Sequence, residues 1–222
     1  MRYGTEEMNV KARCFGILAA LLFTFSIPAP PATAETVELV ALGDSLTAGY
    51  GLDPGEAFPE QLERALRDRG HDVRIANAGV SGDTASGGLA RLEWSVPEDA
   101  DGVIVELGAN DALRGVDPAV TRRAIGAIVA KLKARGQAVL LAGMLAPRNL
   151  GDDYAQAFDA IYPDVAEAEG VLLYPFFLEG VAADAILNQP DGMHPTAEGI
   201  ARVVENILPI VEELIARIKS GE

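Results

Sequence analysis

A serine at position 45 lies in the turn that follows a short apolar run, where it could act as a nucleophile. The run from Val37 to Leu42 is typical of a buried strand, and it leads into Gly43-Asp44-Ser45. Because open α/β sheets bind ligands at the carboxyl ends of their strands, this hydroxyl would be accessible to a substrate. Taken alone, these three residues are more typical of an ordinary turn. The nucleophile hypothesis therefore depends on a base and an oxyanion-binding site elsewhere in the chain.

The chain offers His194 as the base, since a serine hydroxyl reacts only when another group takes its proton. Imidazole suits this task because it titrates near neutrality. Asp191 stands three residues earlier, where its carboxylate could hold the second ring nitrogen and fix the tautomer. The alternative is a polar loop that caps the last helix. His71, between a glycine and an aspartate at a predicted helix end, is expected to be solvated instead.

Attack on an ester creates an oxyanion, which needs hydrogen-bond donors fixed in advance. Three donors are available at predicted strand ends: the backbone N–H of Ser45, the unshielded N–H of Gly79 and the side-chain amide of Asn110. Each of them, taken alone, is also an ordinary turn residue. Together they place suitable residue types at three matching positions.

The pattern between these residues predicts a parallel α/β fold. Apolar runs at 37–42, 73–76, 103–107, 138–142 and 171–174 are predicted strands, and helical spacing of apolar residues follows each of them. Tyr154 to Glu169 is expected to be one helix bent at Pro163, and the last helix is expected to be interrupted near Pro209. Strands that alternate with helices favour a flavodoxin-like three-layer α/β/α sandwich with a five-stranded parallel sheet.

Residues 1–34 are predicted to be a secretory signal peptide. Lys11 and Arg13 precede an apolar run at 14–27, and Ala32-Thr33-Ala34 matches a small-x-small cleavage site. The apolar run is short for a membrane span, although an uncleaved anchor is the alternative, and the true start could be Met8. We therefore expect a periplasmic or secreted protein, with residues 35–222 as a single domain and no stable membrane insertion after cleavage.

Composition narrows the classes of partner and chemistry. The formal net charge is −15, and it becomes −16 without residues 1–34, which carry three basic and two acidic side chains. Such a charge disfavours nucleic acid and anionic membranes as partners. The only cysteine, Cys14, lies in the predicted signal peptide, and the chain has two histidines. We therefore expect no disulfide, no cysteine nucleophile and no metal site.

A nucleotide- or flavin-binding module is the main alternative from another functional class, and it is suggested by the predicted fold alone. The sequence contains neither a Walker loop nor Gly-x-Gly-x-x-Gly. We therefore expect a protein that binds no cofactor. A noncatalytic structural protein is a further alternative.

Four segments resemble the signature blocks of the SGNH (GDSL) hydrolase superfamily, in the order found in that family. They are Gly43-Asp-Ser-Leu46, Asn77-Ala-Gly-Val-Ser-Gly-Asp-Thr84, Gly108-Ala-Asn-Asp111 and Asp191-Gly-Met-His194, and they extend over essentially all of the chain after residue 34. The resemblance implies that Ser45 is the nucleophile, that Gly79 and Asn110 are oxyanion donors, and that His194 and Asp191 are base and orienting acid. The Gly-x-Ser-x-Gly elbow of ordinary α/β-hydrolases is absent.

Further segments resemble the bacterial periplasmic arylesterase, thioesterase and lysophospholipase branch of this superfamily. They are Thr47-Ala-Gly-Tyr50, Ala112-Leu-Arg-Gly115, Asn149 with Tyr154, Ala160-Ile-Tyr-Pro163 and Pro175-Phe-Phe177. The resemblance implies a single-domain, metal-free enzyme with loose acyl-chain specificity, which cleaves small acyl esters or thioesters through an acyl-enzyme. We also expect the protein to be a monomer. The loop at 144–153 departs from the better-known thioesterases, so the acyl-chain preference stays open.

Several residues near the predicted strand ends could contact the substrate. They are Asp44 and Leu46 beside the serine, and the apolar loop residues Leu113, Val116, Met144, Leu145 and Leu150. The apolar ones could line an acyl groove, or they could equally anchor loops against the core. A carbohydrate deacetylase on the same scaffold is the closest enzymatic alternative, and it would act on acetyl groups only.

Overall fold

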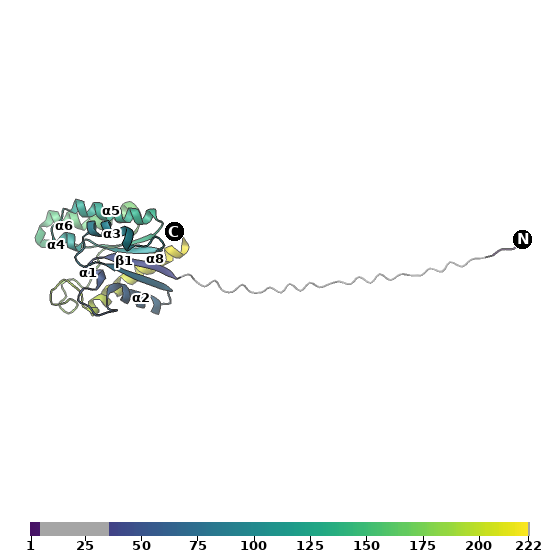
Figure 1. Cartoon of the computed structure of the whole chain (residues 1–222), viewed down its shortest axis with the longest axis horizontal. Coiled ribbons are helices and arrows are strands. Elements are labelled where there is room, and N and C mark those ends of the chain that lie inside the picture. The colour runs from purple at the N-terminus through teal and green to yellow at the C-terminus, as the bar shows by residue number, and fades with distance from the viewer. Residues whose placement is uncertain (5–35, 222) are drawn as a thin grey trace. The chain divides into compact units, whose positions relative to one another are not determined.

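The computed structural model describes residues 1–4 and 36–221, and Figure 1 shows the whole chain. The predicted signal peptide, with Cys14 and the cleavage pattern at 32–34, lies outside these residues except for its first four. None of the helices in the described ranges is both long enough and apolar enough to cross a membrane.

Five parallel strands form the sheet in the order β2-β1-β3-β4-β5. The strands are β1 (Val37–Gly43), β2 (Val73–Gly79), β3 (Gly102–Glu106), β4 (Ala138–Ala142) and β5 (Leu172–Tyr174). This is the strand order of flavodoxin-like sheets, so the predicted fold class is confirmed. The central strands β1 and β3 are apolar apart from Glu38 and Glu106, and almost every residue in them is buried, as expected for a sheet covered on both faces.

Helices cover both faces of the sheet, which lies between two helical layers in Figure 1. One layer contains α2 (Phe58–Asp68) and α8 (Ala197–Ser220), which pack against each other. The other contains α3 (Ala85–Ser95), α5 (Pro118–Ala134), α6 (Asp152–Asp159) and α7 (Ile161–Glu169). Two short helices, α1 (Ser45–Ala48) and α4 (Ala109–Leu113), and a 3₁₀ turn, η1 (Arg148–Leu150), follow β1, β3 and β4.

Local signals account for several helix starts. Asp117 caps α5 by accepting from the Ala119 N–H at 2.8 Å, and Pro118 opens the helix, as predicted. Thr84 caps α3, and Thr196 caps α8, each through its side-chain oxygen. The idea that the segment around Asp191 caps the last helix is therefore wrong.

Two predictions about helix continuity are wrong. The helix expected over 154–169 is two helices that meet at Ala160, and Pro163 lies in the first turn of α7, where a missing N–H costs nothing. In contrast, α8 continues through Pro209 without interruption, since that residue lies on the exposed side of the helix. Strand β2 also extends to Gly79, three residues beyond its predicted end.

The sheet order places three strand ends side by side. Strand β1 lies between β2 and β3, with Gly43 paired to Gly79 on one side and to Glu106 on the other. The segments that leave these strands carry Ser45, residues 80–84 and Asn110. They meet at the point where the order of the sheet reverses, which is where such sheets bind ligands.

Candidate active site

Ser45 is the first residue of α1, and Asp44 alone separates it from the end of β1. The turn is held by Asp44, whose Oδ1 accepts from the Leu46 N–H at 3.0 Å. Gly43 leaves no room for a side chain, because a Cβ there would lie 2.0 Å from Thr47 Oγ1. The sharp turn therefore presents the Ser45 hydroxyl at the mouth of the sheet.

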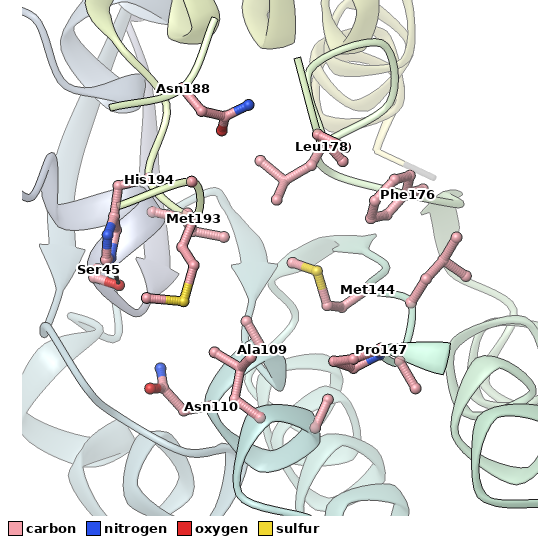
Figure 2. Close-up of a pocket in the computed structure, with 18 of the residues that line it drawn as sticks. Ser45, Ala109, Asn110, Met144, Pro147, Phe176, Leu178, Asn188, Met193 and His194 are labelled. Carbon is pink, nitrogen blue, oxygen red and sulfur yellow. Dashed lines mark hydrogen bonds between the residues drawn. The ribbon is translucent and has the colours of Figure 1, made fainter. Parts of the chain in front are cut away.

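The loop before α8 brings His194 to Ser45, although 149 positions separate them. His194 Nε2 lies 2.9 Å from Ser45 Oγ, and Nδ1 lies 2.6 Å from Asp191 Oδ2. Figure 2 shows the imidazole beside the serine at one side of a cavity. The ring of Tyr50 lies against that of His194, with centroids 4.6 Å apart. The three predicted residues thus form one continuous chain of hydrogen bonds.

Asp191 is fixed by its own loop as well as by the histidine. Its Oδ1 accepts from the backbone N–H groups of Met193 and His194, at 2.9 and 3.0 Å. The hydrogen bond from His194 and these two backbone bonds lower the pKa of the Asp191 carboxyl to about 2. The carboxylate is therefore ionised throughout the neutral range and can hold a proton on Nδ1.

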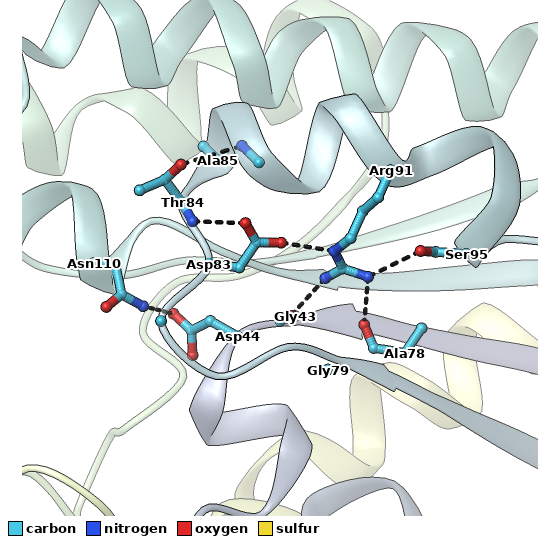
Figure 3. A network of polar contacts seen from close by, with 12 residues as sticks. Gly43, Asp44, Ala78, Gly79, Asp83, Thr84, Ala85, Arg91, Ser95 and Asn110 are labelled. Carbon is cyan, nitrogen blue, oxygen red and sulfur yellow. Dashed lines mark hydrogen bonds and ion pairs between the residues drawn. The ribbon is translucent and has the colours of Figure 1, made fainter.

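Asn110 reaches the site from the first turn of α4, after Gly108, whose φ of +116° suits glycine. Its Nδ2 donates to Asp44 Oδ2 at 3.0 Å (Figure 3), and the residue also lines the cavity. Because an amide carries two N–H donors, the second one stays available for a ligand.

Gly79 does not fit its predicted role as an oxyanion donor. Its N–H already donates to Asn77 Oδ1 at 3.0 Å, and the residue does not line the cavity that contains Ser45. A Cβ at this position would lie 2.3 Å from Ala48 N, so the glycine serves close packing beneath α1. Gly82, three residues later, lines the cavity together with Ser45 and Asn110. Sequence reasoning missed Gly82, although it lies in the same octapeptide.

Asp44 does not contact the cavity either, contrary to its predicted role in substrate binding. It is fully buried, and this burial raises the pKa of its carboxyl to about 6. The buried Glu106 accepts from Thr47 Oγ1 at 2.8 Å and from the Asp44 N–H at 3.4 Å. Burial and the neighbouring Asp44 raise the pKa of Glu106 well above its ordinary value. Because the pKa of Asp44 is raised in the folded state, its ionisation lowers folded-state stability as the pH rises from about 4 through 6, and the raised pKa of Glu106 acts in the same direction.

An apolar cavity of about 500 Å³ opens beside the serine. Four predicted substrate residues line it: Leu46, Leu113, Met144 and Leu145. Val116 and Leu150 do not, and the Val116 carbonyl accepts from Tyr154 Oη at 2.9 Å instead. The prediction for these two residues is therefore wrong, and Val116 serves to anchor its loop.

Sequence reasoning also missed a wall of the cavity. The segment between β5 and α8 supplies Phe176, Leu178 and Met193, which face the interior in Figure 2 together with Met144 and Pro147. Isolated apolar residues in a long loop have no periodicity, so no signal in the sequence separates them from loop anchors.

His71 differs from its predicted solvated state. Its Nε2 lies 3.1 Å from Glu212 Oε1 of α8, and the ring is half-buried. Within residues 1–4 and 36–221, no three His, Cys, Asp or Glu side chains are grouped so that they could hold a metal ion.

The chain is similar to a known protein family, to characterised proteins and to solved structures. The model of the GDSL-like Lipase/Acylhydrolase family matches residues 41–202. Esterase TesA of Pseudomonas aeruginosa is 40% identical over 201 residues, which cover 90% of this chain and 96% of that protein. Thioesterase 1/protease 1/lysophospholipase L1 of Escherichia coli is 38% identical over 178 residues, covering 80% and 83%. The crystal structure of AlinE4, an SGNH-hydrolase family esterase, has a TM-score of 0.69 and 47% identity, covering 82% of this chain and 98% of that one.

Proposed function

The chain belongs to the GDSL-like lipase/acylhydrolase family, and from this premise we propose that it hydrolyses carboxylic ester or thioester bonds of acyl substrates. The observation that carries the proposal is the hydrogen-bonded series Ser45–His194–Asp191 at the edge of an apolar cavity. A nucleophile, a base and an orienting acid within hydrogen-bond reach form the arrangement that acyl transfer requires.

In the proposed mechanism, Ser45 Oγ attacks the acyl carbon while its proton passes to His194 Nε2. The leaving alcohol or thiol takes that proton as the bond to the acyl carbon breaks, which leaves an acyl-enzyme on the serine. Water then attacks the acyl carbon and gives a proton to the same nitrogen. That proton returns to Ser45 Oγ as the bond between Oγ and the acyl carbon breaks, which releases the carboxylic acid and restores the serine. Asp191 stabilises the imidazolium formed in each half of the reaction.

Three donors would hold the developing oxyanion: the N–H groups of Ser45 and Gly82 and the free N–H of Asn110. We propose Gly82 in place of Gly79 because it lines the cavity and because the Gly79 N–H already has a partner. The hydrogen bond to Asp44 supports the role of Asn110, since it fixes the amide plane before a substrate arrives.

The apolar lining of the cavity supports an acyl chain longer than acetyl as the preferred substrate part. We expect kcat/KM for p-nitrophenyl esters to rise about fourfold per methylene from acetate until the cavity is filled, at about 0.8 kcal/mol per buried methylene. The series is measured with acyl-CoA, lysophospholipid and acetylated sugars in the same panel. Activity restricted to acetyl groups would favour the deacetylase, and a flat series would contradict an acyl-binding cavity.

Labelling with a fluorophosphonate probe separates an enzyme from a binding module. The probe reacts only with an activated serine, so one label per chain is expected on Ser45. An unlabelled protein without activity on the panel would overturn the proposed function.

We also propose export, with residues 1–34 as a cleaved signal peptide and 35–222 as the mature single domain in the periplasm or medium. The basic, apolar and small-x-small order of these residues supports it. Mass spectrometry of the protein recovered from its native compartment should give a chain that begins at Glu35. An intact N-terminus in a membrane fraction would instead support the uncleaved anchor.

A further inference from the structure

Arg91 is a charged residue that α3 turns towards the sheet, and it is only 6% exposed. A buried guanidinium is costly unless its donors find partners. Nε donates to Asp83 Oδ2 at 2.6 Å, and Nη1 donates to Ser95 Oγ at 3.1 Å and to the Ala78 carbonyl at 2.8 Å. Nη2 donates to the Gly43 carbonyl at 2.8 Å. Figure 3 shows the fork between these partners, and the arrangement is specific to an arginine.

The two carbonyl groups belong to the ends of neighbouring strands. Gly43 is the last residue of β1 and stands two positions before Ser45, and Ala78 is the penultimate residue of β2. One rigid, planar side chain therefore connects the backbone that leads to the nucleophile with the backbone that leads to the loop at 80–84.

Asp83 extends this connection to the loop itself. It directly follows Gly82, and its Oδ1 accepts from the Thr84 N–H at 3.0 Å while Oδ2 accepts from Arg91. The carboxylate lies so close to α3 that a Cβ at Gly87 would be 1.8 Å from Oδ1. Glycine is unfavourable within a helix, and here Gly87, near the start of α3, leaves the space that the Asp83 carboxylate occupies.

The same loop is also held from the Asn110 side. The Ala85 N–H donates to Asp111 Oδ2 at 2.8 Å, and Asp111 adjoins Asn110 on α4. The three proposed oxyanion donors lie on the segments that follow three neighbouring strands, and polar contacts of buried groups join these segments.

We propose that Arg91, acting through Asp83, is a positioning residue that holds the Gly82 N–H at the oxyanion site of Ser45. This inference rests on the proposed function. The buried Arg91–Asp83 ion pair then has a role in the reaction as well as in folding, because Arg91 bonds backbone next to two oxyanion donors. Gly43 precedes Ser45, and Ala78 and Asp83 lie on the two sides of Gly82.

Two variants disturb the network in different ways. Arg91→Lys keeps the charge but replaces the planar fork by a single ammonium, which cannot reach both carbonyls and the carboxylate. Gly87→Ala substitutes no member of the network, but its Cβ would displace the Asp83 carboxylate. Alanine is itself a better helix former than glycine, so α3 should still form. For each variant we expect kcat to fall about 10- to 100-fold with KM within about twofold, since losing one oxyanion donor outright costs about 10²- to 10³-fold.

Inhibition by a trifluoromethyl ketone gives a readout that a purely structural role would not change. Ser45 Oγ adds to the ketone carbon, the carbonyl π pair becomes an oxyanion and the hydroxyl proton passes to His194, so the adduct needs the same donors. We expect the inhibition constant to rise by about the same factor as kcat falls.

Arg135→Lys and Gly126→Ala are the matched controls. Arg135 is also a shielded arginine that bonds a backbone carbonyl and a glutamate, but it lies at the end of α5, and a Cβ at Gly126 in that helix meets nothing. Both controls should keep wild-type kcat and inhibition constants. All four variants are checked for folding by circular dichroism, and Gly87→Ala decides the question if Arg91→Lys does not fold.

Folded variants with wild-type kcat and inhibition constants would overturn the positioning role, as would a loss confined to KM or an equal loss in the controls. A wild-type protein without hydrolysis or probe labelling would overturn the proposed function itself, which is a separate result.

Discussion

Replacing Ser45 by alanine should lower kcat by about 10⁴- to 10⁶-fold with little change in KM. The variant loses the nucleophile, while the cavity that binds the acyl group stays intact. His194→Ala should lower kcat by about the same factor. It removes the base that lies 2.9 Å from Ser45 Oγ, and a serine hydroxyl without a base is a poor nucleophile. Since the two groups act as one unit, the double variant should be no slower than either single variant. Turnover of p-nitrophenyl esters measures all three.

The chain provides a control for each substitution. Ser220→Ala removes a hydroxyl that contacts only the Arg217 carbonyl near the C-terminal end of α8 among the described residues, and activity should not change. His71→Ala removes the other histidine, which pairs with Glu212 at the opposite end of β2 from the site. Wild-type turnover by Ser45→Ala, or additive losses in the double variant, would contradict a serine–histidine pair.

Much of the fold was predictable because its signals are local. Buried parallel strands are continuous apolar runs, and the Asp117-Pro118 pair marks the start of α5. The order of strands and helices then brings Ser45 and Asn110 to one edge. Helix continuity was less predictable, since Pro163 fits within the first turn of a new helix and Pro209 is tolerated on an exposed face.

The error over Gly79 follows from the length of a strand. The apolar run ends at Ala76, which places Gly79 in the loop, but β2 continues to pair with β1 up to Gly43. The loop therefore begins three residues later, and Gly82 becomes the glycine at the cavity. The sequence Asn77-Ala78-Gly79 is typical of a turn, and only pairing with the neighbouring strand β1 makes it part of the sheet.

The role of Asp44 also depends on contacts that adjacency cannot reveal. It precedes the proposed nucleophile, so substrate contact was a reasonable expectation. In the fold its carboxylate points inward, with Oδ1 on the Leu46 N–H and Oδ2 on Asn110. It therefore acts on a substrate only through the groups that it holds.

Replacing Asp191 by asparagine should lower kcat by about 10²- to 10⁴-fold at neutral pH, with KM nearly unchanged. Asparagine can keep the two backbone hydrogen bonds to its oxygen, so the loop should fold as before. Its amide N–H would then face His194 Nδ1 and favour the tautomer that carries its proton on Nε2. Nε2 could then no longer accept the Ser45 proton. The loss of activity would come from reversing the hydrogen bond between residue 191 and His194 Nδ1, in which the imidazole would become the acceptor.

The pH dependence of activity shows whether Asp191 titrates in the working range of the enzyme. The pKa of Asp191 is lowered to about 2, so its contribution to stability is present above about pH 4 and is lost only as the pH falls through 2. The acid limb of wild-type activity should therefore not come from Asp191. At every pH above 5, where the wild-type carboxylate is ionised, the asparagine variant should remain slower than wild type.

Asp184→Asn is the matched control for this substitution. Asp184 lies in the same loop, and its Oδ1 accepts from the N–H groups of Ile186 and Leu187 at 2.8 and 3.3 Å, without a histidine partner. This variant tests the turn alone and should keep kcat within about twofold. Equal losses in both variants would mean that the loop conformation, rather than the tautomer of His194, controls the rate. Full activity in Asp191→Asn would mean that the imidazole needs no orienting carboxylate.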